Sequence, residues 1–254
     1  MFEVKNLHAG HDDNALLKGI SFKMQAGESI SLLGPNGCGK TTLLRSILGL
    51  HPITKGQILL KNQCFQSMKP KLKAQHMAYV PQIQQSAFGH PVKEVVLMGR
   101  SSQHDLFSNY TKADHDIAHA ALERVGIADL AERPFTQLSG GQKQLALIAR
   151  ALTQQAPIFV MDEPVNGLDF GNQIKLLELI KELVSEGLTV IQTTHYPDHA
   201  LLASSRVLLM NHGKVFADGP PEEMLNSENM QQLYGINTEL AHFKNRSFCI
   251  PTDN

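Results

Sequence analysis

The chain has 254 residues, of which 42% are hydrophobic and 19% charged, an ordinary balance for a globular protein that can bury a large core. Its formal net charge of −1 gives no reason to expect a nucleic-acid partner, and no apolar run approaches the ~18 residues of a membrane-spanning helix. The N-terminus contains acids and no apolar core, so we expect no signal peptide, and three scattered cysteines fit a reducing cytoplasm.

The first part of the chain, residues 1–81, is predicted to be rich in strands and to carry a phosphate-binding loop. Residues 28–33 suit a buried parallel strand, and residues 41–48 have helical character. Between them lies GPNGCGKT, a match to GxxxxGK[ST] in its expected strand–loop–helix context. Backbone N–H groups and the helix N-terminus then face a polyanion. The predicted nucleotide-binding residues are Gly34, Pro35, Asn36, Gly37, Cys38, Gly39, Lys40, Thr41 and Thr42.

A helical insertion is predicted at about residues 83–137. Residues 92–99 form a short apolar helix, and residues 114–125 place apolar side chains at roughly helical spacing. Gln82 precedes the insertion, so we expect it to link the state of the nucleotide to the insertion's orientation.

The α/β core is predicted to resume at residue 138 with a second anion site. Ser139, Gly140 and Gly141 precede Gln142 and an apolar-periodic helix, residues 142–152. A glycine-rich helix N-terminus suits an anion. Because no catalytic acid stands beside this second phosphate site, we expect it to be shared between two chains.

An Asp-Glu pair follows a predicted buried strand at residues 158–161. Asp162 can hold Mg²⁺ through water, and Glu163 can polarise an attacking water. After a phosphate loop, this interpretation is favoured over two acids that merely cap a helix.

His195 follows a β-rich run, residues 188–194, where its imidazole can contact a γ-phosphate. The alternative is a satisfied surface histidine. His195 and His199, like His115 and His119, are four residues apart, but without a third ligand solvated helix faces are favoured over metal sites. Further on, residues 207–217 predict a hairpin and residues 220–235 a helix, whereas residues 236–254 carry no readable pattern.

These ordered motifs resemble the nucleotide-binding subunit of ABC transporters, from residue 2 to about residue 219. AYVPQ, ending at Gln82, resembles the family's Q-loop, LSGGQ its signature, NGLD at 166–169 its D-loop, and His195 its switch histidine. The resemblance implies an α/β fold: a P-loop NTPase core with a mixed sheet flanked by helices and an N-terminal antiparallel β part, plus the inserted helical subdomain. We expect an ATPase domain at 1–235 and a C-terminal extension at 236–254.

The resemblance also implies the activity, ATP hydrolysis coupled to transport. The cofactors would be ATP and Mg²⁺, with the metal at Thr41, Gln82 and Asp162, and the catalytic residues Glu163, His195 and Gln82. The expected partners are a second copy of the chain, two integral membrane permease subunits and, indirectly, a periplasmic or lipid-anchored substrate-binding protein. The expected location is the cytoplasmic side of the inner membrane, as a peripheral subunit.

The cargo is suggested by finer resemblances. VPQ at 80–82, VKEVVLMGR at 92–100 and LYGI at 233–236 resemble importers of iron–siderophores, haem and cobalamin. Iron or another metal chelate ranks first, then cobalamin or haem, then molybdate-type oxyanions. A soluble ABC ATPase and an exporter ATPase are the competing classes.

Two residues depart from the ordinary pattern. His11 stands where the family usually has an aromatic residue that stacks on adenine, so it either stacks there or is simply loop. Cys38, beside Lys40, is either a reactive thiol of lowered pKa or a small residue filling a small space.

Overall fold

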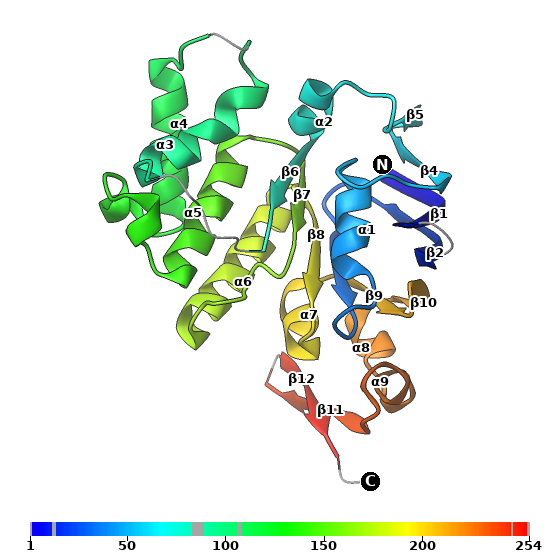
Figure 1. The fold of residues 1–254 in the computed structure, drawn as a ribbon. Coiled ribbons are helices and arrows are strands. Elements are labelled where there is room, and N and C mark those ends of the chain that lie inside the picture. Colours follow the sequence, from blue (N-terminus) through cyan, green and yellow to red (C-terminus); the bar gives the residue numbers. More distant parts are fainter. Residues whose placement is uncertain (1, 12–13, 83–88, 106–107, 245, 253–254) are drawn as a thin grey trace. The chain divides into compact units, whose positions relative to one another are not determined.

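The structure is a computed structural model, and it describes residues 2–11, 14–82, 89–105, 108–244 and 246–252 (Figure 1). The chain forms two compact units. The first unit joins Met1–Met68 to Leu177–Asn254, and the second unit is Lys69–Leu176.

The first unit contains an antiparallel sheet in the order β2-β1-β4-β5. In β1, the apolar Phe2 and Val4 are buried. A register irregularity that includes Asn6, at a φ of 45°, then shifts the buried positions by one residue, so that Leu7 and Ala9 are buried as well. The predicted N-terminal antiparallel part is therefore confirmed. The strands are β1 (Phe2–His11), β2 (Asn14–Met24), β4 (Lys55–Leu60) and β5 (Gln63–Cys64).

A second sheet forms the core of the first unit. β3 lies between β8 and β9 and is parallel to both, while β10 pairs with β9 in the antiparallel direction. All residues of β3 and β8 are buried, as expected for strands covered on both faces. The sheet is mixed, as predicted, and its strands in this unit are β3 (Ser29–Leu33), β8 (Thr189–Thr194), β9 (Arg206–Asn211) and β10 (Lys214–Gly219).

The register of this sheet brings two predicted site segments to one edge. Leu33, the last residue of β3, pairs with Thr194, the last residue of β8. Because the two strands are parallel, Gly34 and His195 both leave the sheet at its carboxyl edge, where α/β folds bind their ligands. The helices that follow are α1 (Lys40–Ile47) and α7 (Pro197–Ala203).

The C-terminal part of the first unit differs from the prediction. Residues 220–235 form two helices rather than one, because the side chain of Asn226 accepts a hydrogen bond from the Asn229 N–H and so begins a new helix. Residues 238–251, where the sequence showed no pattern, form an antiparallel hairpin. The elements are α8 (Pro221–Met224), α9 (Ser227–Tyr234), β11 (Thr238–Phe243) and β12 (Arg246–Pro251).

A buried apolar cluster joins these C-terminal elements to the sheet. It includes Leu33 of β3, Leu209 of β9 and Leu233 of α9, and Leu240 and Cys249 of the hairpin pack against it. Full burial of one such leucine contributes about 2 kcal/mol. The hairpin is thus packed on the sheet core of the first unit, to which it belongs.

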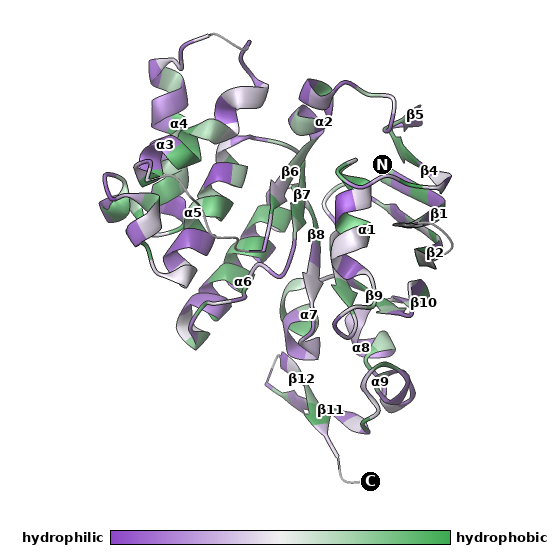
Figure 2. Cartoon of the chain, viewed as in Figure 1, coloured by the Kyte–Doolittle hydropathy of each residue, from purple (hydrophilic) through white to green (hydrophobic). Residues whose placement is uncertain are grey.

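The second unit combines a parallel strand pair with helices. β6 pairs with β7, whose residues are all buried, as predicted for residues 158–161. α3, α4 and α5 pack against one another, and Figure 2 shows hydrophobic and hydrophilic residues on α4 and α5. The elements are α2 (Pro70–His76), β6 (Met77–Val80), α3 (Val92–Leu97), the 3₁₀ helices η1 (Met98–Ser102), η2 (Ala128–Leu130) and η3 (Phe135–Gln137), α4 (Lys112–Arg124), α5 (Gly140–Thr153), β7 (Ile158–Met161) and α6 (Phe170–Ser185), which continues into the first unit.

The second unit contains the predicted insertion at 83–137 and extends beyond it on both sides. The bounds of the insertion and the division at residue 235 stay predictions. Within the described ranges, no helix has both the length and the apolar character that a membrane crossing requires.

Candidate nucleotide-binding site

The phosphate loop connects the end of β3 to α1. Gly37 and Gly39 have φ values of 79° and 107°, which favour glycine because a side chain would be strained there. The ammonium of Lys40 is buried and donates to the carbonyls of Gly34 and Pro35 at 2.6 and 3.1 Å. The loop therefore curls around the ammonium group of its own Lys40. Thr41 and Thr42 are half-buried in the first turn of α1.

The start of α1 fits a polyanion. Among the described residues, no side chain caps this helix, and its first turn contains no acid. The first N–H groups of a helix carry a partial positive charge and lack partners within the helix. Together with Lys40, these features match the phosphates of a nucleotide.

Gly34 is required by a close approach of two backbones. A Cβ at this position would lie 2.2 Å from the carbonyl oxygen of Met210 in β9 and 2.8 Å from the Cys38 sulfur. Any larger residue at Gly34 would push the loop away from the sheet.

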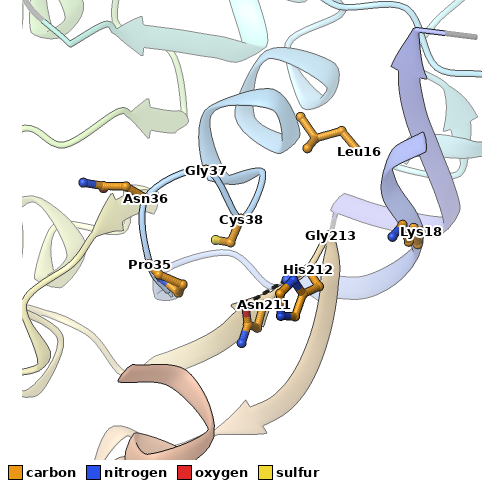
Figure 3. A pocket seen from close by; sticks show the side chains of 9 residues that line it. All are labelled: Leu16, Lys18, Pro35, Asn36, Gly37, Cys38, Asn211, His212 and Gly213. Carbon is orange, nitrogen blue, oxygen red and sulfur yellow. Dashed lines mark hydrogen bonds between the residues drawn. The ribbon is translucent and has the colours of Figure 1, made fainter. Parts of the chain in front are cut away.

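A pocket of about 340 Å³ lies beside the loop (Figure 3). The turn between β9 and β10 forms one wall, where the His212 N–H donates to the Asn211 side chain at 2.9 Å. That turn is tied to the loop, because the Gly213 N–H donates to the Cys38 carbonyl at 3.1 Å. The lining residues are Leu16, Lys18, Pro35, Asn36, Gly37, Cys38, Asn211, His212 and Gly213.

Cys38 is a buried residue of the phosphate loop and lines this pocket. Burial raises the pKa of its thiol, and the nearby Lys40 ammonium only partly offsets that effect. This direction is opposite to the lowered pKa that the reactive interpretation needs, so it favours the alternative in which Cys38 fills a small space.

His11 is the last residue of β1, where its backbone pairs with Asn14. Its side chain lies outside the described part of the structure, so the contact of His11 with adenine stays a prediction.

His195 lies between β8 and α7 and is half-buried. Its ring is 4.0 Å from the ring of Tyr196, which is in turn 4.7 Å from the ring of His199. No group of three His, Cys, Asp or Glu side chains that could hold a metal ion occurs in the residues that the structure describes.

In the second unit, the acids follow β7. Asp162 is 1% exposed, and its N–H donates to the Val80 carbonyl at 2.9 Å. Glu163 has a φ of 48°, an unusual conformation for a residue with a side chain. Its carboxylate accepts hydrogen bonds from the amides of Gln82 at 3.3 Å and Asn166 at 2.7 Å.

The structure thus brings together the predicted Gln82 and Glu163, which are 81 positions apart in the chain. It also adds Asn166, which was placed in a motif but given no role. Its spacing of three residues after Glu163 is the signal that could have assigned it, because that spacing allows a turn in which the two side chains meet.

The signature segment begins α5. The Ser139 side chain accepts from the Gln142 N–H at 3.3 Å, and the Gln142 side chain accepts from the Ser139 N–H at 3.0 Å. This reciprocal pair is a capping box, which satisfies two backbone N–H groups at the exposed start of the helix. Gly141 is close-packed, since a Cβ there would lie 3.1 Å from Leu168.

A glycine loop joining a buried parallel strand to a helix, with a buried lysine inside it, defines a P-loop nucleotide-binding protein. The described arrangement divides the predicted residues between the units: the loop and His195 belong to the first, and Gln82, the signature, Asp162 and Glu163 to the second.

Comparison with known proteins defines the class further. The ABC transporter family model matches residues 17–166. An uncharacterized ABC transporter ATP-binding protein of Haemophilus influenzae is 39% identical over 95% of this chain and 92% of its own length. A molybdate import ATP-binding protein of the same organism is 37% identical over 88% and 83%, and an iron chelatin transport ATP-binding protein of Helicobacter pylori 34% identical over 97% and 97%.

Among solved structures, a metal-chelate type ABC transporter in an inward-facing conformation matches with a TM-score of 0.85 and 33% identity, over 99% of this chain and 97% of that one. The chain belongs to the ATP-binding proteins of ABC transporters, and its activity is ATP hydrolysis coupled to transport. The predicted fold class and enzyme class are confirmed.

Proposed function

We propose that this chain, an ABC importer ATPase, energises the uptake of an iron–siderophore or another metal chelate. The observation that carries this proposal is the likeness, over 99% of the chain, to a metal-chelate type transporter. The iron chelatin relative points the same way. A haem, cobalamin or molybdate-type oxyanion cargo is the alternative, and the molybdate import relative favours the oxyanion among these.

The residues have separate roles in hydrolysis. The N–H groups of the loop and Lys40 bind and neutralise the phosphates, because a buried ammonium attracts them more strongly than one in water. Glu163 orients and polarises the attacking water, and Gln82 and Asn166 hold its carboxylate in place. His195 contacts the γ-phosphate and responds to its loss.

Thr41, Asp162 and Gln82 are the residues that would hold Mg²⁺. Their hydroxyl, carboxylate and amide oxygens are the hard donors that this ion prefers. When bound, Mg²⁺ supplies charge neutralisation to the phosphates of ATP.

The working unit is a pair of chains. A pair related by twofold symmetry supplies each nucleotide with the loop of one copy and the capped start of α5, at Ser139, of the other. Dimeric ABC cassettes among the solved relatives support this arrangement. Two permease subunits and a substrate-binding protein complete the importer, with this chain on the cytoplasmic side of the inner membrane.

The test is a tagged pull-down of the full chain from mildly solubilised membranes, with the partners identified by mass spectrometry. We expect a polytopic permease, and the substrate-binding protein of the same system would then be titrated with ferric chelates, haem, cobalamin and molybdate. Recovery of soluble partners alone would overturn the transport role. A binding protein that takes molybdate and no chelate would overturn the cargo.

A further inference from the structure

His195 leaves the sheet in a short connection. Only His195 and Tyr196 separate the end of β8 from the start of α7, and the Tyr196 N–H donates to the Thr194 hydroxyl at 3.1 Å. A side chain that must sense a phosphate needs a fixed backbone. Further contacts to this connection come from the C-terminal elements.

Tyr234, the last residue of α9, reaches this connection directly. Its hydroxyl donates to the main-chain carbonyl of His195 at 3.2 Å. The tyrosine ring packs against the buried apolar cluster of the first unit, so its position is fixed. Burial raises the pKa of Tyr234 well above its ordinary value, so the hydroxyl stays protonated and keeps donating.

The same turn of α9 also supports the phosphate loop. The carbonyl of Gln232 accepts from the Asn211 side chain at 3.2 Å, and Asn211 begins the turn whose Gly213 N–H donates to the Cys38 carbonyl. The end of α9 therefore contacts His195 directly, and it contacts the phosphate loop indirectly, through the turn between β9 and β10.

The hairpin β11–β12 holds the other side of the connection. The Asp198 carboxylate, in the first turn of α7, accepts from the Cys249 N–H at 2.8 Å, and β12 packs against α7. The start of α7 is thus fixed by β12, and the residue before it by α9.

We propose that Tyr234 is a positioning residue for the switch histidine: its hydroxyl sets the backbone of His195, and through it the direction of the imidazole toward the γ-phosphate. This inference rests on the proposed role of His195 in hydrolysis. It gives the C-terminal elements a part in catalysis beyond packing. A purely structural Tyr234 would affect folding stability and leave the turnover of folded protein unchanged.

The test compares Tyr234→Phe with Tyr110→Phe in the full chain. Both remove one hydroxyl and keep the ring, and Tyr110 is a half-buried residue of the second unit, like Tyr234 in the first, whose hydroxyl lies 3.0 Å from the Ser101 hydroxyl. For Tyr234→Phe we expect kcat for ATP hydrolysis to fall about fivefold with KM for ATP within about twofold, the loss expected from one hydrogen bond. Tyr110→Phe should leave both unchanged.

Two readouts separate positioning from stability. The ¹H–¹³C NMR signal of the His195 imidazole, assigned with His195→Ala, should shift in Tyr234→Phe and not in Tyr110→Phe. In single-turnover assays on a His195→Ala background, Tyr234→Phe should cause no further loss, because both substitutions remove the same action.

Unchanged kcat with an unmoved His195 signal overturns the inference and leaves the ATPase function intact. A lowered kcat that persists unchanged on the His195→Ala background also overturns it, since Tyr234 then acts by another route. If the wild-type chain hydrolyses no ATP, the proposed function fails first, and the NMR signal still tests the contact between Tyr234 and His195.

Discussion

The carboxylate of Glu163, the proposed catalytic acid, is held by several features of the local structure. Its backbone lies in the left-handed region, at a φ of 48°, which costs of the order of 1 kcal/mol. Two amide groups, from Gln82 and Asn166, donate to the same oxygen. The strained turn and the two donors place the acid directly after β7 and aim it in one direction.

Glu163→Gln should therefore abolish turnover without abolishing binding. The amide keeps the size of the side chain and loses the base, so we expect kcat to fall at least about 100-fold while the affinity for ATP changes little. Phosphate release and equilibrium binding of a fluorescent ATP analogue measure the two quantities. Glu123→Gln, on the exposed side of α4, is the control. Full turnover in Glu163→Gln would remove this residue from its role.

Gly213 is a second residue whose identity is set by local geometry. It has a φ of 77°, and a Cβ would lie 1.9 Å from the Leu16 carbonyl oxygen. Gly213→Ala should lower the unfolding free energy by more than the ~1 kcal/mol of backbone strain alone and should weaken ATP binding, because the turn contacts the phosphate loop.

Gly27→Ala is the matched control for that substitution. Its φ of 73° is nearly the same, and its Cβ would meet nothing within 4 Å. Denaturant melts of both variants isolate the steric part of the effect. Equal losses in the two variants would contradict the close approach at Gly213.

At the scale of elements, Asp114 anchors α4 in the second unit. Its buried carboxylate accepts hydrogen bonds from the Thr111 hydroxyl and from the Arg100 guanidinium at 2.6 and 2.8 Å. These two groups hold the pKa of Asp114 well below its ordinary range. The start of α4 is thereby joined to the 3₁₀ helix that follows α3.

Asp114→Asn should cost about 3 kcal/mol at pH 7, because it leaves the half-buried guanidinium of Arg100 without its charge partner. The depressed pKa in the folded state means that this contribution is fully present above about pH 4 and is lost as pH falls through the folded-state value. The difference in unfolding free energy between wild type and variant should thus shrink below about pH 4.

The exposed pair of Asp105 and Lys71, at 2.8 Å, provides the control. Asp105→Asn should change stability by less than about 1 kcal/mol, since exposed ion pairs contribute little. Urea melts between pH 3 and pH 7 would show both effects. An Asp114 variant as stable as wild type at pH 7 would contradict the anchoring role.

The sequence predicted the central elements well, because the physical signals are local there. Short apolar runs mark β3, β7 and β8, and the glycine pattern marks the phosphate loop between a strand and a helix. The site residues of each unit were assigned from the same local signals, and those assignments stay predictions.

The hairpin β11–β12 could not be predicted, for two reasons. The sequence between its strands carries no Asn-Gly or Asp-Gly pair that would favour a tight turn, and its strands alternate weakly between polar and apolar residues. The contacts of Tyr234 with His195 and of Gln82 with Glu163 link residues 39 and 81 positions apart. Tertiary packing determines such contacts, and one sequence does not display it.

At the scale of the whole molecule, the anion sites of one chain outnumber its catalytic acids. The phosphate loop and the start of α5 both suit phosphate, but in the described part of the chain only one Asp-Glu pair follows a buried strand. The proposed twofold pair of chains would resolve this by combining the two kinds of site.

Mixing two inactive variants tests that sharing. Lys40→Ala and Ser139→Arg each remove one kind of site, and each homodimer should be inactive. In mixed dimers, one composite site retains both Lys40 and Ser139, so mixing should restore part of the hydrolysis if the residues act in trans. Mixtures with wild-type thermal melts and no recovered hydrolysis would contradict the shared site.

The cap at Ser139 has a chemical consequence for what this position tolerates. The side-chain oxygen uses a lone pair to accept from the Gln142 N–H, and its hydroxyl hydrogen remains available to an incoming anion. Aspartate begins a helix equally well but would repel phosphate, and alanine neither caps nor donates. A hydroxyl is the smallest group that serves as helix cap and phosphate donor at once, which leaves threonine as the natural replacement.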